Sequence, residues 1–316
     1  MTTTSTPATR SEATSPAPRS SSQIRRDKRR WTGWGFVLPF LVVFALVLVA
    51  PVVYAIYLSL FQEQMIGGNS FVGADNYVRA LTDPNFWDAL GRVALFLVVQ
   101  VPIMLFIALF AALALDSARL HFTAFFRISI FLPYAVPAVV AALMWGFIYG
   151  NRFGLVGNLE DATGWDLPDL LSQSWVLASI GNIVTWEFVG YNMLLFYAAL
   201  RVISPDLYEA AELDGANWFQ RFRWITISII RPEVFVVTLT CTIAALKVFG
   251  PIYALTRGGP GDSTIVPSYY SYTEFFQKQQ VGYGATIATA LTIVIVILAV
   301  LFIRAQERVE RSEGAR

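Results

Sequence analysis

Residues 208–232 read YEAAELDGANWFQRFRWITISIIRP and lie between two strongly apolar parts of the chain. A loop that only joined two apolar segments would need no such pattern, because flexible polar residues would serve as well. The charged, alanine-rich stretch therefore predicts a helix that a partner outside the apolar segments contacts.

A well-formed helix start precedes this stretch. Ser204 is a candidate N-cap, Pro205 follows at the first helical position, and Asp206 lies in the first turn. Small alanine side chains then allow another protein to approach closely, and a glycine permits a turn. Apolar residues suited to anchoring a partner follow at Trp218, Phe219 and Phe222.

The composition is that of a membrane protein. Of the 316 residues, 56% are hydrophobic and 14% are charged, and the mean hydropathy is +0.55. This combination lies outside the usual range of a soluble domain. A net charge of +1 gives no reason to expect a nucleic-acid partner. Cys241 and His121 are the single cysteine and the single histidine, which excludes an internal disulfide and argues against a metal site.

Six segments are long and apolar enough to cross a bilayer, which takes about 20 residues per helix. They predict an all-α polytopic membrane protein. Five prolines fall within the first three segments, where neighbouring helices can satisfy the freed carbonyls, and they predict kinked helices in a bundle. These prolines are Pro39, Pro51, Pro102, Pro133 and Pro137. The six candidate spans are 34–60, 89–115, 127–149, 173–199, 233–255 and 283–303.

The spans divide the chain into three parts. Residues 1–30 are rich in Ser, Thr, Pro and Ala and are typical of a disordered tail. Residues 31–305 form the six-span domain, and residues 306–316 form a second tail. A cleaved secretory signal is the alternative for the start of the chain, since basic residues precede an apolar run. That run is too long for a signal, and five more spans follow.

The distribution of Lys and Arg predicts the orientation, because basic loops stay in the cytoplasm. With the N-terminus inside, most basic residues outside the spans fall in cytoplasmic segments. The opposite loops hold only Arg79, Arg152, Arg257 and Lys278. We therefore expect both termini, and the loop at about 203–232, on the cytoplasmic side.

The sequence has no motif for catalysis. It lacks a GxxxxGK[ST] phosphate-binding loop, a GxSxG elbow and an HExxH pair. We expect no enzymatic activity, no cofactor and no metal in this chain, and this makes a membrane-embedded enzyme the least favoured class. The acidic residues Glu160, Asp161, Asp166 and Asp169 are expected to form a solvated face.

The stretch that follows Tyr208 resembles the EAA loop of ATP-binding cassette (ABC) importer permeases. The match consists of Glu209, Ala210 and Ala211, then Gly215 after three residues, and Ile225 ten residues further on. The resemblance implies the type I ABC importer permease fold.

In that family the EAA loop forms a coupling helix that docks into a groove of the ATP-hydrolysing subunit. The residues that take this role by resemblance are Glu209, Ala210, Ala211, Asp214 and Gly215. One departure is visible after the isoleucine. The family has Leu-Pro there, whereas this chain has Ile227-Ser228 and reaches a proline only at Pro232.

A second stretch, YALTRGGPGDST at residues 253–264, is similar to a segment of carbohydrate permeases of the maltose and glycerol-phosphate type. The resemblance covers about residues 31–305. It implies a location in the inner membrane of a bacterial-type cell and a sugar or polyol as substrate. It also implies ABC ATPase subunits, a second and non-identical permease subunit, and an extracytoplasmic binding protein as partners.

Span four carries polar side chains, which normally face a bundle interior or an aqueous cavity. An aromatic ring beside hydrogen-bonding groups suits a sugar, because its C–H faces pack on rings and its hydroxyls need partners. The resemblance places Tyr191 on a substrate-contacting tyrosine, and the other family contacts of this span on Val184 and Phe188. The candidates for substrate contact are Asn182, Trp186, Glu187, Tyr191 and Asn192, with Lys247 from span five.

Alternatives remain for these residues and for the function. Aromatic and amide side chains also pack transmembrane helices together. A lone ammonium in the membrane costs about 3 kcal/mol, so Lys247 could instead form a structural ion pair with Glu187. The alternative function is an ion-coupled secondary carrier for a small polar solute. Such carriers show repeat symmetry, which is not evident here, and they need no EAA loop.

Overall fold

The computed structural model describes residues 34–64, 68–117, 121–151 and 153–314, so the tail expected at 1–30 lies outside the described residues. The chain divides into two units, Met1–Tyr54 and Ala55–Arg316. The first long apolar helix runs over Trp34–Ser59. It includes a π-helical turn, η1 (Ala45–Val49), and ends as α2 (Ala50–Ser59). The π-helical turn precedes Pro51, whose ring nitrogen cannot donate to the carbonyl four residues earlier.

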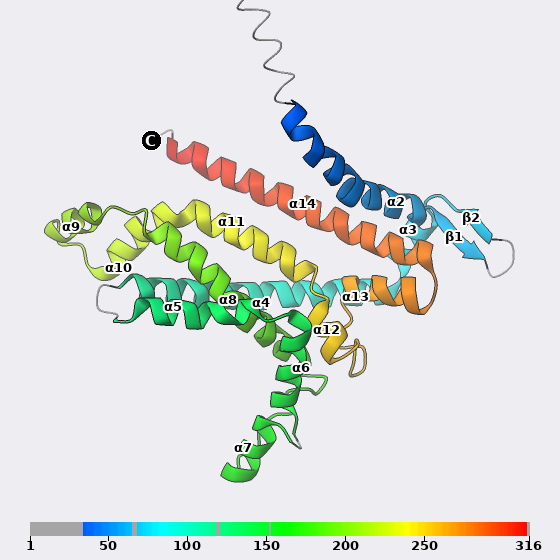
Figure 1. Ribbon diagram of the computed structural model, residues 1–316, viewed down its shortest axis with the longest axis horizontal. Helices are drawn as coiled ribbons and strands as arrows, with labels where there is room; N and C mark the ends of the chain where they lie inside the picture. The colour runs from blue at the N-terminus through cyan, green and yellow to red at the C-terminus, as the bar shows by residue number, and fades with distance from the viewer. Residues whose placement is uncertain (1–33, 65–67, 118–120, 152, 315–316) are drawn as a thin grey trace, which may run out of the picture. The chain divides into compact units, whose positions relative to one another are not determined.

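The second unit is helical except for one short hairpin (Figure 1). The hairpin pairs β1 with β2 in antiparallel register, with Phe61 opposite Phe71, which is a small addition to the expected all-α fold. In chain order after α2, the elements are β1 (Phe61–Gln64), β2 (Gly68–Phe71), α3 (Asp75–Thr82), α4 (Pro84–Asp116), α5 (Thr123–Phe131), η2 (Leu132–Ala135), α6 (Ala138–Tyr149), α7 (Leu155–Thr163), α8 (Val176–Leu200), α9 (Pro205–Leu213), α10 (Trp218–Arg221), η3 (Phe222–Thr226), α11 (Ile227–Leu246), α12 (Gly250–Leu255), α13 (Pro267–Tyr272), η4 (Thr273–Gln277) and α14 (Val281–Gly314).

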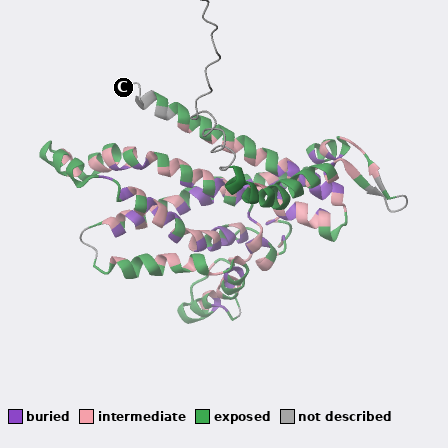
Figure 2. Ribbon diagram, turned by 45° about the horizontal axis from the view of Figure 1, so that its top comes forward, coloured by how far each residue is buried: buried purple, intermediate pink, exposed green. Residues whose placement is uncertain are grey.

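The core of the second unit lies where α4, α8 and α11 pack against one another, and α11 also packs against α14. Figure 2 shows buried residues on the facing sides of these helices and exposed residues on their outer sides. Along α4 the buried positions recur every three or four residues, which is the period of one helix face. They include Val93, Phe96, Gln100, Met104, Ala108 and Ala112. The two alanines let the helix backbones approach closely.

Among the described residues, five helices are long and apolar enough to cross a membrane, and a sixth span is present if one bent pair counts as a span. The bent pair falls in the span expected at 127–149. It consists of Thr123–Ala135 and Ala138–Tyr149, which meet at 100°. Pro133 lies in the 3-10 turn η2, and Pro137 caps α6. Because a residue before proline avoids the helical conformation, Val136 is extended and the helix breaks there.

The other prolines of the second unit's spans do not break their helices. α4 continues through Pro102, and α11 continues through Pro232. The prediction of kinks is therefore confirmed at the bent pair within the span expected at 127–149, and it stays a prediction for α4.

Two boundaries differ from the expected ones. The fifth span begins at Trp218 rather than at 233, because residues 218–232 are already helical and continue into α11. Only the first half of the expected loop at 203–232 therefore lies between spans. The last helix extends to Gly314, so most of the expected tail at 306–316 is a continuation of α14.

A hydrogen-bonded cluster holds the start of α4 to α13 and α14. Asp83 accepts hydrogen bonds from the hydroxyls of Tyr270 and Tyr283, both at 2.6 Å. Burial alone would raise the pKa of Asp83, but these bonds, the backbone N–H of Asn85 and the charge of Arg79 outweigh it and hold the pKa below its usual value. Burial and the bond to Asp83 raise the pKa of Tyr270. The carboxylate thus stays ionised at neutral pH while Tyr270 keeps its proton to donate.

Candidate functional site

A cavity of about 370 Å³ lies between α4, α8, α11 and the bend that joins η2 to α6. We call it the central cavity. Its volume is at the lower end of the range of small-molecule sites. The lining residues that matter below are Gln100, Tyr134, Val184, Glu187, Phe188, Tyr191, Asn192, Cys241, Lys247 and Phe249.

Aromatic rings form one wall of the central cavity. The rings of Tyr134 and Tyr191 are stacked, with centroids 5.0 Å apart and planes 17° apart. Phe188 meets Tyr134 edge-on, at 5.7 Å. Tyr191 is 39% exposed, so its ring remains open to a ligand. Val184 and Phe188, the other two positions indicated by the resemblance, line the same cavity.

Two buried polar side chains of α8 lie beside this wall. Glu187 is 6% exposed, and its Oε2 has no hydrogen-bond partner among the described residues. Asn192 is 2% exposed; its Oδ1 accepts a long hydrogen bond of 3.5 Å from the thiol of Cys241, and its Nδ2 has no partner in the same part of the chain. Buried polar groups are nearly always paired in folded proteins. Their grouping at one cavity is therefore a sign of ligand binding.

Lys247 also lines the cavity, and it comes from the break between α11 and α12. It is exposed, because the helix ends at this residue. Within the described part of the chain, no ion pair joins it to Glu187. The structural ion pair considered from the sequence is thus not formed, and the break explains how a lysine is accommodated within the span.

Asn182 and Trp186 lie away from the central cavity. Asn182 donates a hydrogen bond of 2.7 Å to the hydroxyl of Tyr149, and Trp186 packs edge-on against Trp145 at 5.7 Å. The two residues are four apart in the sequence and share a face of α8 that differs from the face of Glu187 and Tyr191. That face contacts α6.

Sequence reasoning missed Gln100 and Tyr134. Gln100 is buried in α4 and lines the central cavity, although its position is far from span four in the sequence. The sequence does single out Gln100, because an uncharged amide within an apolar span is costly unless it has a partner. Tyr134 had no comparable signal, because its place in the wall depends on the bend after η2.

The segment after α8 forms the expected short helix, α9, with Pro205 at its first turn. Ser204 occupies the N-cap position, but its side chain makes no capping hydrogen bond. At the other end, Gly215 has φ +80°, and its N–H bonds to the carbonyl of Glu212 while Ala216 N–H bonds to that of Ala211. This pair of bonds is a Schellman motif, in which glycine is favoured because the conformation is left-handed.

The next helix begins directly after this turn. Asn217 and Gln220 form a reciprocal capping box that starts α10. Arg221 pairs with Glu212 of α9 at 2.8 Å, which holds the two short helices together. The α9–α10 segment is thus a compact, ordered helix–turn–helix rather than an extended loop.

The α9–α10 segment presents both charged and apolar side chains to its surroundings. Glu209, Ala210 and Asp214 are exposed. Leu213 is 89% exposed and Trp218 67% exposed. Large apolar side chains grouped on a short exposed segment are typical of a protein-binding surface.

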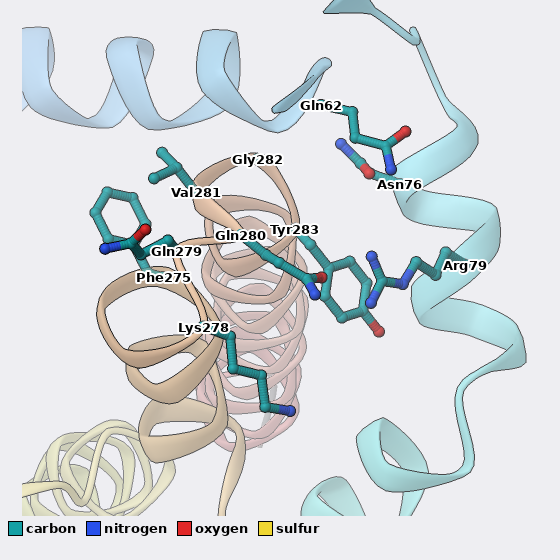
Figure 3. A pocket seen from close by; sticks show the side chains of 10 residues that line it. All are labelled: Gln62, Asn76, Arg79, Phe275, Lys278, Gln279, Gln280, Val281, Gly282 and Tyr283. Carbon is teal, nitrogen blue, oxygen red and sulfur yellow. The ribbon is translucent and has the colours of Figure 1, made fainter. Parts of the chain in front are cut away.

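A second cavity, of about 770 Å³, lies near the Asp83 cluster. Figure 3 shows Arg79 from α3 beside the ring of Tyr283, with Lys278 and Gln280 from the segment before α14. The arginine lies 3.8 Å from the ring centroid. Lys278 is paired with the buried Glu274 at 2.6 Å, and Arg79 lies close enough to Asp83 to lower its pKa. These pairings balance the positive charges, so this cavity makes a weaker ligand site than the central one.

Comparison with known proteins identifies the family. The model of the family described as "Binding-protein-dependent transport system inner membrane component" matches residues 84–312. The chain belongs to this family. Its membership confirms the resemblance to importer permeases, and it favours a transport component over an ion-coupled carrier or an enzyme.

Relatives of this inner membrane component extend over nearly the whole chain. It is 33% identical over 288 residues to the lactose transport system permease protein LacF of Rhizobium radiobacter, which covers 87% of this chain and 94% of the relative. It is 30% identical over 275 residues to the trehalose/maltose transport system permease protein MalF of Thermococcus litoralis, which covers 86% and 92%.

A solved structure confirms the fold of the inner membrane component. The chain is similar to one chain of a bacterial ABC transporter involved in the import of the acidic polysaccharide alginate. The TM-score is 0.80, the identity is 20%, and the match covers 91% of this chain and 99% of that chain. The all-α, polytopic permease fold expected from the sequence is therefore confirmed.

Proposed function

We propose that this permease imports a sugar or related polyol across the inner membrane. The substrate arrives on an extracytoplasmic binding protein and passes through the central cavity by alternating access, driven by ABC ATPase subunits and together with a second permease subunit. The observation that carries the substrate class is the central cavity, where an aromatic wall faces buried polar groups. Relatives named for lactose and for trehalose/maltose support the same class.

The chemistry of the cavity favours a neutral, hydroxyl-rich solute. The open ring of Tyr191 offers an apolar surface for the C–H face of a sugar ring. Glu187 supplies a hydrogen-bond acceptor, and the Asn192 amide supplies a donor. A hydroxyl group both donates and accepts, so it can satisfy both side chains.

The α9–α10 segment is the contact with the ATPase in this proposal. The residues assigned to this contact lie in the second half of α9 and in the turn that follows it. They are Glu209, Ala210, Ala211, Asp214 and Gly215. The exposed side chains of Leu213 and Trp218 provide the apolar part of the contact. A helix–turn–helix held by its glycine turn and a capping box can transmit movement without deforming first.

Reconstitution tests the proposed function. The permease is assembled in liposomes with its ATPase, second permease and binding-protein partners, and uptake of radiolabelled lactose, maltose and trehalose is measured with and without ATP. We expect ATP-dependent accumulation of at least one sugar. Uptake that required an ion gradient and no ATP would support the secondary carrier instead.

The orientation in this proposal places both termini and the α9–α10 segment in the cytoplasm. Figure 1 supports a common side for the C-terminus and the α9–α10 segment, since the C-terminal end of α14 and this segment lie at the same end of the second unit. A reporter fused after residue 160 is expected to lie outside the cytoplasm, and a reporter fused after residue 214 is expected to lie inside it. The reverse pattern would contradict the orientation.

Tyr191→Ala is expected to lower kcat/KM for sugar uptake roughly tenfold, because losing the ring removes about 1.4 kcal/mol of packing on the sugar. The complex with the ATPase should still assemble, since Tyr191 lies in α8, outside the α9–α10 segment, and is partly exposed. Tyr191→Phe is the matched control, because it keeps the ring, and it should retain most of the uptake. Wild-type kinetics in Tyr191→Ala would remove this residue from the site.

A further inference from the structure

Three polar side chains around the central cavity each keep one buried atom that has no hydrogen-bond partner among the described residues. They are the Oε1 of Gln100, the Oε2 of Glu187 and the Nδ2 of Asn192. The residues are 5%, 6% and 2% exposed, respectively. An unpaired buried polar atom costs free energy that is recovered when a partner arrives. All three residues line the same cavity, so a ligand there can supply the partners.

Gln100 comes from a different helix than the other two. It lies on α4, whereas Glu187 and Asn192 lie on α8. Its present contacts are weak, because its Nε2 reaches the Sδ of Met104 at 3.5 Å and the Oγ1 of Thr185 at 3.4 Å. The distance to Thr185 is long for an N–H···O hydrogen bond, and the thioether sulfur of Met104 is a weak acceptor. The amide therefore loses little when it turns.

Gln100 also separates two hollows. Besides the central cavity, it lines a neighbouring apolar hollow of about 400 Å³ between α4 and α8, which Thr185 lines as well. The bond to Thr185 holds the amide toward this second hollow. A change of side-chain torsion would bring the amide to the central cavity without moving the backbone.

We propose that Gln100 contacts the transported solute and helps to determine which one is accepted. In this arrangement the amide of Gln100 turns into the central cavity and bonds to a hydroxyl on the side of the sugar opposite Glu187 and Asn192. The three side chains then form a set of acceptors and donors that matches neighbouring hydroxyl groups, while Tyr191 packs on the ring. The inference rests on the proposed function, because it assumes that the central cavity is the site of transport.

A role as packing between helices explains Gln100 less well. An amide that joins two transmembrane helices does so by hydrogen bonds across them. Here the only hydrogen bond from Gln100 to the neighbouring helix among the described residues is the long one to Thr185, and the carbonyl makes none with the described residues. A site that hydrogen-bonds a hydroxyl also rejects solutes that lack it, which is how a neutral amide can set specificity.

The first test compares Gln100→Met with the wild type in the reconstituted complex. Methionine keeps the length of the side chain and removes the amide. With lactose, maltose and trehalose as probes, we expect KM for the transported sugar to rise roughly fivefold to tenfold, and the maximal uptake rate to change by a smaller factor. Thr185→Val is the matched control, because it keeps the amide of Gln100 and removes only the bond that holds this amide toward the neighbouring hollow, so its KM should not rise. An unchanged KM in Gln100→Met, or a loss of rate alone, would overturn the proposal.

The second test does not depend on the sugar. In a Cys241→Ala background, cysteines are placed singly by Gln100→Cys and Tyr191→Cys, and a water-soluble methanethiosulfonate reagent is applied to the assembled complex. We expect both positions to be labelled, and position 100 to be protected by the transported sugar. Labelling of position 191 without position 100 would overturn the proposal. If no sugar is transported by the wild type, the proposed substrate class fails, whereas labelling at position 100 still shows that this residue faces the transport cavity.

Discussion

Gly190→Ala is expected to remove most of the folded protein from the membrane. A Cβ atom at this position of α8 would overlap the backbone oxygen of Ile130 and lie 2.7 Å from the Cα of Phe131. Both atoms belong to the backbone of α5, so no side chain can rotate away to make room. Overpacking a well-packed interface costs about 1–3 kcal/mol or more, and here the two helices must separate.

The separation would also reach the central cavity. Phe131 directly precedes η2, which carries Tyr134 into the aromatic wall. Protein that survives should therefore bind the sugar poorly as well. The measurement is the yield of detergent-solubilised protein that elutes as a single species, together with its melting temperature.

Gly181→Ala is the matched control on the same helix. A Cβ atom there would lie 3.5 Å from the Cγ of Gln100 and 3.6 Å from the Cε2 of Phe96, which are ordinary contacts with side chains. Alanine also favours the helix by about 1 kcal/mol over glycine. We expect wild-type yield from this variant. Equal yields from both variants would show that α5 and α8 do not pack as closely as the structure has them.

The spans could be predicted from the sequence because their signal is local. A run of about 20 apolar residues must be helical in a membrane, whatever the rest of the chain does. The start of the fifth span could not be placed, since residues 218–232 contain three arginines and Pro232 and therefore look like a loop by hydropathy. Backbone hydrogen bonds keep this segment helical all the same, and a π-helical turn, η3, lies within it.

The candidate site was predictable to the extent that it lies on one helix. Glu187 and Tyr191 are four residues apart, so helix geometry alone places them on one face. The same geometry should have separated them from Asn182 and Trp186. The amide of Gln100 is visible within an apolar span, but its place at the cavity depends on the packing of α4. Tyr134 reaches the cavity only through the bend at Pro137, which no local pattern places.

Gly215→Val is expected to abolish ATP-driven uptake while the protein remains in the membrane. The sequence predicted that a glycine permits a turn here, and the structure has a turn at Gly215 with φ at +80°. No heavy atom lies within 4 Å of an added Cβ, so the effect comes from the backbone and not from a clash. A β-branched residue is a genuine outlier in the left-handed region, and the turn between α9 and α10 must therefore change its path. The spans do not depend on this turn, whereas the surface that docks on the ATPase does.

Asparagine provides the matched control for this change, because it tolerates the left-handed conformation better than other residues with a side chain. Gly215→Asn should thus keep at least half of the wild-type uptake, although it adds more atoms than alanine would. If valine and asparagine at this position were equally harmful, the side chain rather than the backbone conformation would be the cause, and the glycine would have to contact the ATPase directly.

Glu209→Lys tests the same contact without disturbing the turn. Glu209 is exposed and lies in the middle of α9, and no described residue forms an ion pair with it. Its removal should therefore leave the permease folded, and a lysine there reverses the charge offered to the ATPase. We expect uptake to fall at least tenfold and the ATPase to co-purify in reduced amount.

Glu212→Gln is a suitable comparison, since it changes a neighbouring carboxylate that is already paired with Arg221 within the segment. Both partners of this ion pair belong to the α9–α10 segment, and the side chain of Glu212 is 72% exposed. Exposed ion pairs contribute little, so the loss of this one should have little effect on uptake. Wild-type uptake and co-purification in Glu209→Lys would show that α9 is a solvated surface helix, and the contact with the ATPase would then have to lie elsewhere on the cytoplasmic face.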